Sequence, residues 1–90
     1  MMNDIVITAG CRTPIGTIGG QFKTLTALDL SIPIMKELVL RSGIDPACVD
    51  DVIWGCNYQR TYKENNLARV ALIKAGLPDS VPGITVHRNC

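Results

Sequence analysis

The 90-residue sequence has little charge imbalance, few aromatic residues and no long hydrophobic run. Its nine basic and eight acidic residues give a net charge of +1, and the longest run of one sign is Asp50–Asp51. A nucleic-acid-binding face needs clustered basic residues, so this class of partner is not expected. No stretch approaches the ~20 apolar residues of a membrane-spanning helix, and the first residues carry neither a basic nor an Arg-rich leader. We therefore expect a cytoplasmic protein with no membrane partner.

Cysteine and histidine are present, but not at the spacings that bind metals. The four cysteines, Cys11, Cys48, Cys56 and Cys90, include no C-x-x-C pair, and His87 is the one histidine. A zinc site of the usual pattern is therefore not expected, and without a secretion signal neither is a disulfide framework. Cys11, Cys48 and Cys56 are most simply small buried hydrophobic residues.

The glycine-rich segment Gly10–Gly20 also lacks the spacings that cradle phosphates. Its glycines stand at positions 10, 16, 19 and 20, which match neither G-x-G-x-x-G nor G-x-x-x-x-G-K-[ST]. Cys11 and Arg12 are adjacent, whereas a phosphatase loop needs a phosphate cradle between its cysteine and its arginine. We expect this segment to be a structural connection rather than a nucleotide site.

What the sequence does contain is an alternation of strand-like and helix-like segments. Short β-branched apolar runs predict three strands, at Asp4–Ala9, Asp51–Cys56 and Ile84–His87. Between them, apolar residues at helical spacing predict helices over Ala27–Arg41 and Asn66–Ala75. The order β-α-β-α-β predicts an α/β fold, the βαβαβ part of a doubly wound domain with a parallel sheet. Such a unit is incomplete, because it leaves a sheet edge and a face uncovered.

The ends of the first helix are marked in the sequence. Thr26 is a plausible N-cap, and Asp29 three residues later gives a capping-box pattern. Gly43 stands at the usual position just after a helix. Pro33 lies within the helix and removes one backbone hydrogen bond, so a kink or a shifted start is expected.

The composition is apolar for so short a chain. The hydrophobic fraction is 47% and the mean hydropathy is +0.20. A small domain has a large surface relative to its volume and is usually more polar. The excess of apolar residues suggests that other parts of a protein cover some faces of this chain. An unusually apolar small domain would have the same composition.

Cys90 differs from the other cysteines by its position. It directly follows the predicted strand Ile84–His87, where the next helix of an α/β fold would begin. Enzymes of this class place their chemistry at the carboxyl ends of strands, and a helix N-terminus favours the thiolate. Cys90 is therefore a candidate nucleophile, with a buried structural cysteine as the alternative. His87 could act as its base, but residues three apart on a strand face opposite sides, so a core or interface histidine is favoured.

Three segments of the chain resemble the thiolase family, which comprises acetyl-CoA acetyltransferases and 3-ketoacyl-CoA thiolases. They are Ile5–Gly16, which contains Arg-Thr-Pro; Asn66–Leu72 with Ala75–Pro78; and Val81–Cys90. The third ends where the family has its acyl-accepting cysteine. The chain departs from the family pattern at His87, where thiolases often have asparagine. The order and spacing of the three segments make the resemblance specific, and it extends over the whole chain.

The resemblance implies an acyltransferase whose one catalytic side chain in this chain is Cys90, the acyl-thioester nucleophile. The reaction would be the reversible thiolytic cleavage of a 3-ketoacyl-CoA, or the condensation of two acetyl-CoA molecules to acetoacetyl-CoA. Acetyl-CoA and 3-ketoacyl-CoA would be substrates, with no metal and no further cofactor. The CoA-binding residues are not identified. A place in fatty acid metabolism and a homodimer or homotetramer are implied as well, with the strand Ile84–His87 at or near the subunit interface.

The resemblance also implies how the chain is organised. Residues 1–90 would be the amino-terminal part of the thiolase N-terminal domain in a thiolase-like doubly wound fold, and the remainder of the subunit would be its partner. The 90 residues alone would be inactive, since the other catalytic groups of the family lie beyond them. The alternative is a non-catalytic fragment with the thiolase fold that acts as an interaction module.

Overall fold

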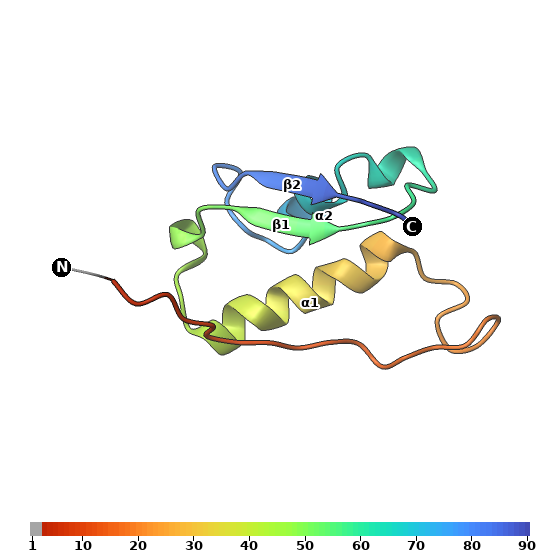
Figure 1. Ribbon diagram of the computed structural model, residues 1–90, viewed down its shortest axis with the longest axis horizontal. Helices are drawn as coiled ribbons and strands as arrows, with labels where there is room; N and C mark the ends of the chain where they lie inside the picture. The colour runs from red at the N-terminus through yellow and green to blue at the C-terminus, as the bar shows by residue number, and fades with distance from the viewer. Residues whose placement is uncertain (1–2) are drawn as a thin grey trace.

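The structure, a computed structural model, describes residues 3–90 and shows two helices and two strands there (Figure 1). In chain order the elements are α1 (Ala27–Ser42), β1 (Val52–Gly55), α2 (Leu67–Lys74) and β2 (Gly83–Val86), and the single 3-10 turns Pro46–Cys48 and Tyr62–Glu64 precede β1 and α2. The strands pair in parallel, from Val52 opposite Gly83 to Gly55 opposite Val86. α2 packs against the sheet, and α1 packs against α2. The predicted parallel α/β arrangement is confirmed for these four elements.

The ends of α1 follow the sequence signals closely. The Asp29 N–H donates to Thr26 Oγ1 at 3.1 Å, and the Thr26 N–H donates to the Asp29 carboxylate at 2.9 Å, which completes the capping box. Gly43 ends the helix with a φ of 69°, a conformation that glycine adopts at little cost. The helix runs through Pro33 and still begins at Ala27, so of the two expected effects the shifted start is wrong and the kink stays a prediction.

Polar side chains attach α2 to β2. The Asn66 amide caps the helix and donates to the Gly83 carbonyl at 2.9 Å, while Thr85 Oγ1 donates to Asn66 Oδ1 at 2.9 Å. Thr85 Oγ1 also accepts the Ala68 N–H at 2.9 Å, which satisfies a free amide of the first turn. A Cβ on Gly83 would lie 2.9 Å from Leu72 Cδ2 and 3.0 Å from the Arg69 nitrogen. Glycine at this position lets the strand approach the helix closely.

The predicted strand at Asp4–Ala9 is not formed. This segment has no strand partner, and the side chains of Ile5 and Ile7 are 100% and 97% exposed. It approaches only the C-terminal end of α1, where the Arg41 guanidinium donates to the Gly10 carbonyl at 3.2 Å, and the chain that follows Gly10 runs beside the helix (Figure 1). A strand is stable only when a neighbouring strand takes up its backbone hydrogen bonds, and no strand within residues 3–90 pairs with this one. The β-branched residues favour a strand here, but the strand is not formed because residues 3–90 provide no neighbouring strand to pair with it.

The core lies between the helices and one face of the sheet. Its buried members are Leu28, Met35, Leu67, Ala71, Leu72, Leu77 and Val81. Side chains on the other face of the sheet are open, with Ile53 66%, Ile84 49% and Val86 45% exposed. The sheet is thus covered on one side within residues 3–90. No helix in this range is long and apolar enough to cross a membrane.

Candidate functional site

The carboxyl ends of β1 and β2 meet at one edge of the sheet. The Cys56 N–H donates to the Val86 carbonyl at 2.9 Å, so the two chains are still paired as they leave the strands. An open hollow of about 810 Å³ lies here, lined by Gly55, Cys56, Asn57, Val86, His87 and Arg88. Ligands of parallel α/β proteins bind at this kind of edge. This hollow is therefore the candidate functional site.

Cys90 follows this edge directly. Its side chain is exposed, and it lies four residues beyond the end of β2 with a free thiol. The residue before it, Asn89, has a φ of 54°, in the left-handed region that asparagine tolerates better than most residues. The carboxyl-end position predicted for Cys90 agrees with this arrangement.

The other three cysteines have different surroundings. Cys56 is half-buried, and its thiol lies 3.4 Å from the Tyr58 carbonyl. Cys11 is half-buried as well, with its thiol 3.9 Å from the Ile34 carbonyl. Cys48 is exposed at the end of the turn Pro46–Cys48, so the expectation that it is buried is wrong. That turn packs no residue into the core, because it lies on the surface between α1 and β1.

His87 is not a core residue in the described part of the chain. β2 ends at Val86, and the exposed His87 lines the hollow beside Cys56 and Arg88. Of the two predicted environments, the core is therefore wrong within residues 3–90, and the interface stays a prediction. The hollow brings together a thiol, an imidazole and a guanidinium, and Cys90 follows two residues later in the chain.

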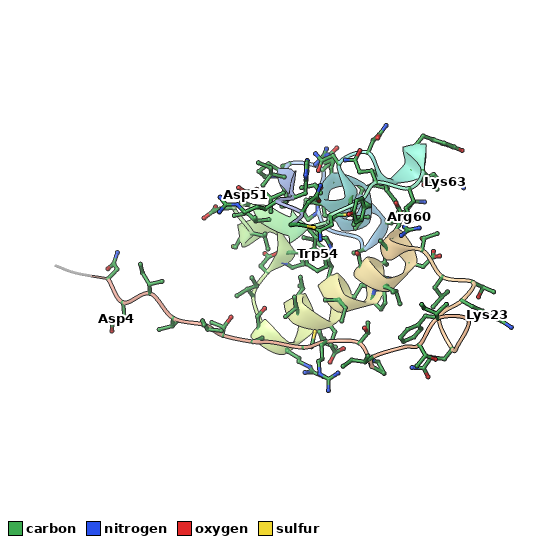
Figure 2. The ribbon with its side chains drawn as sticks, turned by 45° about the vertical axis from the view of Figure 1, so that its right-hand side comes forward. Asp4, Lys23, Asp51, Trp54, Arg60 and Lys63 are labelled. Carbon is green, nitrogen blue, oxygen red and sulfur yellow. The ribbon has the colours of Figure 1, made fainter. Side chains whose placement is uncertain are left out.

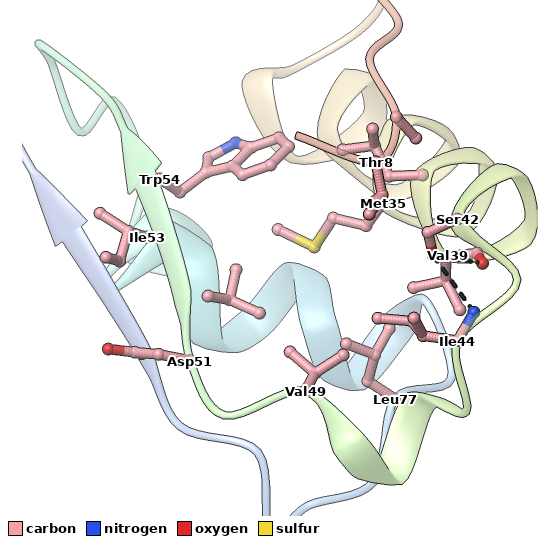
Figure 3. A pocket seen from close by; sticks show the side chains of 13 residues that line it. Thr8, Met35, Val39, Ser42, Ile44, Val49, Asp51, Ile53, Trp54 and Leu77 are labelled. Atoms are coloured by element: carbon pink, nitrogen blue, oxygen red, sulfur yellow. Dashed lines mark hydrogen bonds between the residues drawn. The ribbon is translucent and has the colours of Figure 1, made fainter. Parts of the chain in front are cut away.

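A second hollow, of about 280 Å³, lies between α1 and the edge of β1 (Figure 3). Its lining is apolar apart from Thr8, Ser42 and Asp51, and Ser42 Oγ donates to the Val39 carbonyl at 2.9 Å. None of its residues is a nucleophile with a neighbouring base. This hollow is a packing gap rather than a site of chemistry. Within residues 3–90, no three His, Cys, Asp or Glu side chains gather as a metal site.

The sequence and fold have clear relatives. The family model described as "Thiolase, N-terminal domain" matches residues 5–90. The chain belongs to the thiolase family. The resemblance seen in the sequence is therefore confirmed, and so is the α/β fold class as part of the thiolase N-terminal domain.

Individual thiolases are similar along nearly the whole chain. A 3-ketoacyl-CoA thiolase of Pseudoalteromonas translucida is 47% identical over 99% of the chain, which spans 23% of that protein. A 3-oxoadipyl-CoA/3-oxo-5,6-dehydrosuberyl-CoA thiolase of Escherichia coli is 44% identical over 99% of the chain, which spans 22% of it. The crystal structure of the Bacillus anthracis acetyl-CoA acetyltransferase superposes with a TM-score of 0.87 at 49% identity, over 92% of this chain and 21% of that one. The chain thus spans less than a quarter of the length of these relatives.

Sequence reasoning missed two buried polar residues near the helices. Ser31 is 6% exposed and accepts the Trp54 indole N–H at 2.9 Å, which joins α1 to β1. Trp54 lies between the sheet and α1 (Figure 2). Glu64 is 2% exposed and precedes α2. The serine stands at a buried helical spacing from Leu28 and Met35, so it could have been found from periodicity. Nothing in the polar sequence around Glu64 marks that residue as buried.

Proposed function

We propose that the protein containing this chain is an acetyl-CoA acyltransferase of the thiolase type, with Cys90 as the acyl-accepting nucleophile. The observation that carries the proposal is the location of Cys90 just beyond the carboxyl edge of a parallel sheet in a thiolase N-terminal domain. A thiol suits reversible acyl transfer, because exchange of a thioester with the thiol of CoA is nearly balanced. Residues 1–90 would form the amino-terminal part of that domain, and the rest of the polypeptide would supply the remaining groups.

The reaction follows from the chemistry of the thiolate. The sulfur of Cys90 attacks the ketone carbon of a 3-ketoacyl-CoA, and the bond between that carbon and the next breaks. The electron pair leaves on the acetyl-CoA enolate, which takes a proton, while the acyl group stays on sulfur as a thioester. The thiol of CoA then accepts the acyl group and the thiolate of Cys90 is restored. Condensation of two acetyl-CoA molecules is the same path in reverse.

We also propose the setting of this reaction. CoA thioesters would be the substrates without a further cofactor, and the protein would be a cytoplasmic homodimer or homotetramer. The support for an oligomer is the free outer edge of β2, the second of two strands in the described sheet. Edge strands of this kind need cover, and a second subunit would provide it.

Turnover by the full-length protein tests the function. With acetoacetyl-CoA and CoA, the wild-type protein is expected to form acetyl-CoA, and Cys90→Ala is expected to lower kcat by about three orders of magnitude or more. Cys48→Ala is the matched control, because Cys48 is exposed, precedes β1 in the chain and does not line the hollow. Wild-type turnover by Cys90→Ala would contradict the proposal. A well-folded wild-type protein without any turnover would favour the interaction module instead.

A further inference from the structure

The strand β2 is attached to α2 at alternate residues. Before the strand begins, Arg69 Nη1 donates to the Val81 carbonyl at 2.7 Å. At the first residue of the strand, the Asn66 amide donates to the Gly83 carbonyl at 2.9 Å. Two residues further on, the Thr85 hydroxyl bonds to the start of α2. These attachments join β2 to the cap and first turn of the helix, on the face of the sheet that α2 covers.

Thr85 makes the last of these attachments through its side chain. Thr85 Oγ1 donates to Asn66 Oδ1 and accepts the Ala68 N–H, both at 2.9 Å. The hydroxyl therefore contacts the residue that caps α2 and also satisfies an amide that the first turn leaves free. Valine has nearly the same shape and also favours strands, but it can make neither bond. The bonds to α2 thus depend on the hydroxyl and not on the shape of the side chain.

This attachment lies next to the candidate site. Val86, the residue after Thr85, lines the hollow, and its carbonyl accepts the Cys56 N–H at 2.9 Å. That bond is the last one between the two backbones as they leave the sheet. Within residues 3–90, no hydrogen bond holds residues 87–90, which continue from β2 to the end of the chain (Figure 1). In this part of the protein, the end of β2 therefore sets the position of Cys90 relative to the sheet.

We propose that Thr85 is a positioning residue for acyl transfer: its hydroxyl attaches the end of β2 to the first turn of α2 and thereby fixes where the strand places Cys90. The inference rests on the proposed function, since it concerns the same nucleophile. Without the hydroxyl, the Ala68 N–H loses its acceptor, and the remaining attachments lie upstream, at Val81 and Gly83. The end of β2 then opens more readily. A misplaced nucleophile slows the chemical step.

Amide hydrogen exchange in the full-length protein tests the structural half. Thr85→Val keeps the volume and the branching but removes the hydroxyl, and the Cys56 amide is expected to exchange about tenfold faster. Thr85→Ser is the matched control, because its hydroxyl can make both bonds, and it should exchange like the wild type. The Val39 amide, in the interior of α1, reports on global unfolding. An unchanged Cys56 amide in Thr85→Val would overturn the proposal, and so would equal acceleration at Val39.

Single-turnover acylation by acetyl-CoA tests the functional half. The rate of Cys90 acylation is expected to fall about tenfold in Thr85→Val and in Thr85→Ala, and to return to within about twofold of wild type in Thr85→Ser. Ser31→Ala is the control for lost stability, because it removes a hydrogen bond between α1 and β1 and leaves the bonds of β2 in place. It should be acylated at the wild-type rate.

The role of Thr85 would be overturned by wild-type acylation of Thr85→Val, or by acylation of Thr85→Ser or Ser31→Ala that is as slow as that of Thr85→Val. The exchange measurement needs no acyl transfer, so the two proposals fail separately. A folded wild-type protein that is not acylated would overturn the proposed function, whereas an unchanged Cys56 amide would overturn the assignment to Thr85.

Discussion

At the scale of single residues, one relay of hydrogen bonds connects the helix layer to the sheet. The Trp54 indole N–H donates to Ser31 Oγ, and Ser31 Oγ donates to the Ala27 carbonyl at 2.7 Å. Trp54 needs such a partner, because a buried indole N–H without an acceptor is costly. The relay attaches β1 to α1 at Ser31.

Ser31→Ala is therefore expected to destabilise the protein by about 1–3 kcal/mol, since it leaves the indole N–H of Trp54 without its partner. The measurement is the free energy of unfolding in urea for the full-length protein. In a Trp54→Phe background the same change should cost much less, because no donor is left unpaired. Equal costs in the two backgrounds would show that the hydrogen bond carries no energy of its own.

At the scale of elements, the sequence predicted correctly the structure that depends on neighbouring residues, and it failed where the structure depends on pairing with a distant segment. Thr26, Asp29 and Gly43 fix the ends of α1 through bonds within a few residues, so the sequence was sufficient to predict that helix. The strand predicted at Asp4–Ala9 failed, because pairing depends on a neighbour that local sequence does not specify. The edge position of Cys90 could be predicted from the strand before it. The burial of Glu64 could not, because it depends on contacts that the local sequence does not specify.

The capping box of α1 predicts a dependence of stability on pH. The backbone N–H of Thr26, followed by its hydroxyl, lowers the pKa of Asp29 below its ordinary value. Because folding lowers this pKa, the ionised Asp29 carboxylate stabilises the folded state. This stabilisation is fully present above the unfolded-state pKa and is lost as the pH falls through the folded-state pKa. Asp29→Asn should thus lower Tm at neutral pH, and the difference from wild type should shrink below about pH 4.

Asp50→Asn is the control for this measurement, since the Asp50 side chain accepts no hydrogen bond within residues 3–90. Thermal melts of the full-length protein across acidic to neutral pH provide the readout. A difference between Asp29→Asn and wild type that stays constant with pH would contradict the assigned bond. So would an equal pH dependence of the Asp50→Asn difference.

At the scale of the whole molecule, the chain exposes more surface than a self-sufficient domain does. Its accessible surface is 6989 Å², whereas a folded monomer of this mass exposes about 5,200 Å². Its radius of gyration is 14.3 Å, compared with about 12 Å for a compact domain of this length. The open sheet face and the segment at Ile5–Ile7 account for part of the excess. The apolar composition predicted such uncovered faces.

The isolated 90-residue peptide is accordingly expected not to fold cooperatively. At micromolar concentration its circular dichroism should change gradually on heating, without a sigmoidal transition, because too little apolar surface is buried to offset the loss of chain entropy. The full-length protein under the same conditions is the control and should melt cooperatively. A sharp transition of the peptide alone would contradict this expectation and would strengthen the case for a stand-alone interaction module.

The central claim is that Cys90 carries the acyl group, and mass mapping of the acyl-enzyme tests it most directly. The full-length protein is incubated with acetyl-CoA, quenched in acid and digested, and the modified peptide is located by mass spectrometry. We predict a single acetyl thioester on the peptide that contains Cys90, and none in Cys90→Ser, because a hydroxyl ionises far less readily than a thiol. An acetyl group on Cys11, Cys48 or Cys56 with Cys90 unmodified would contradict the account.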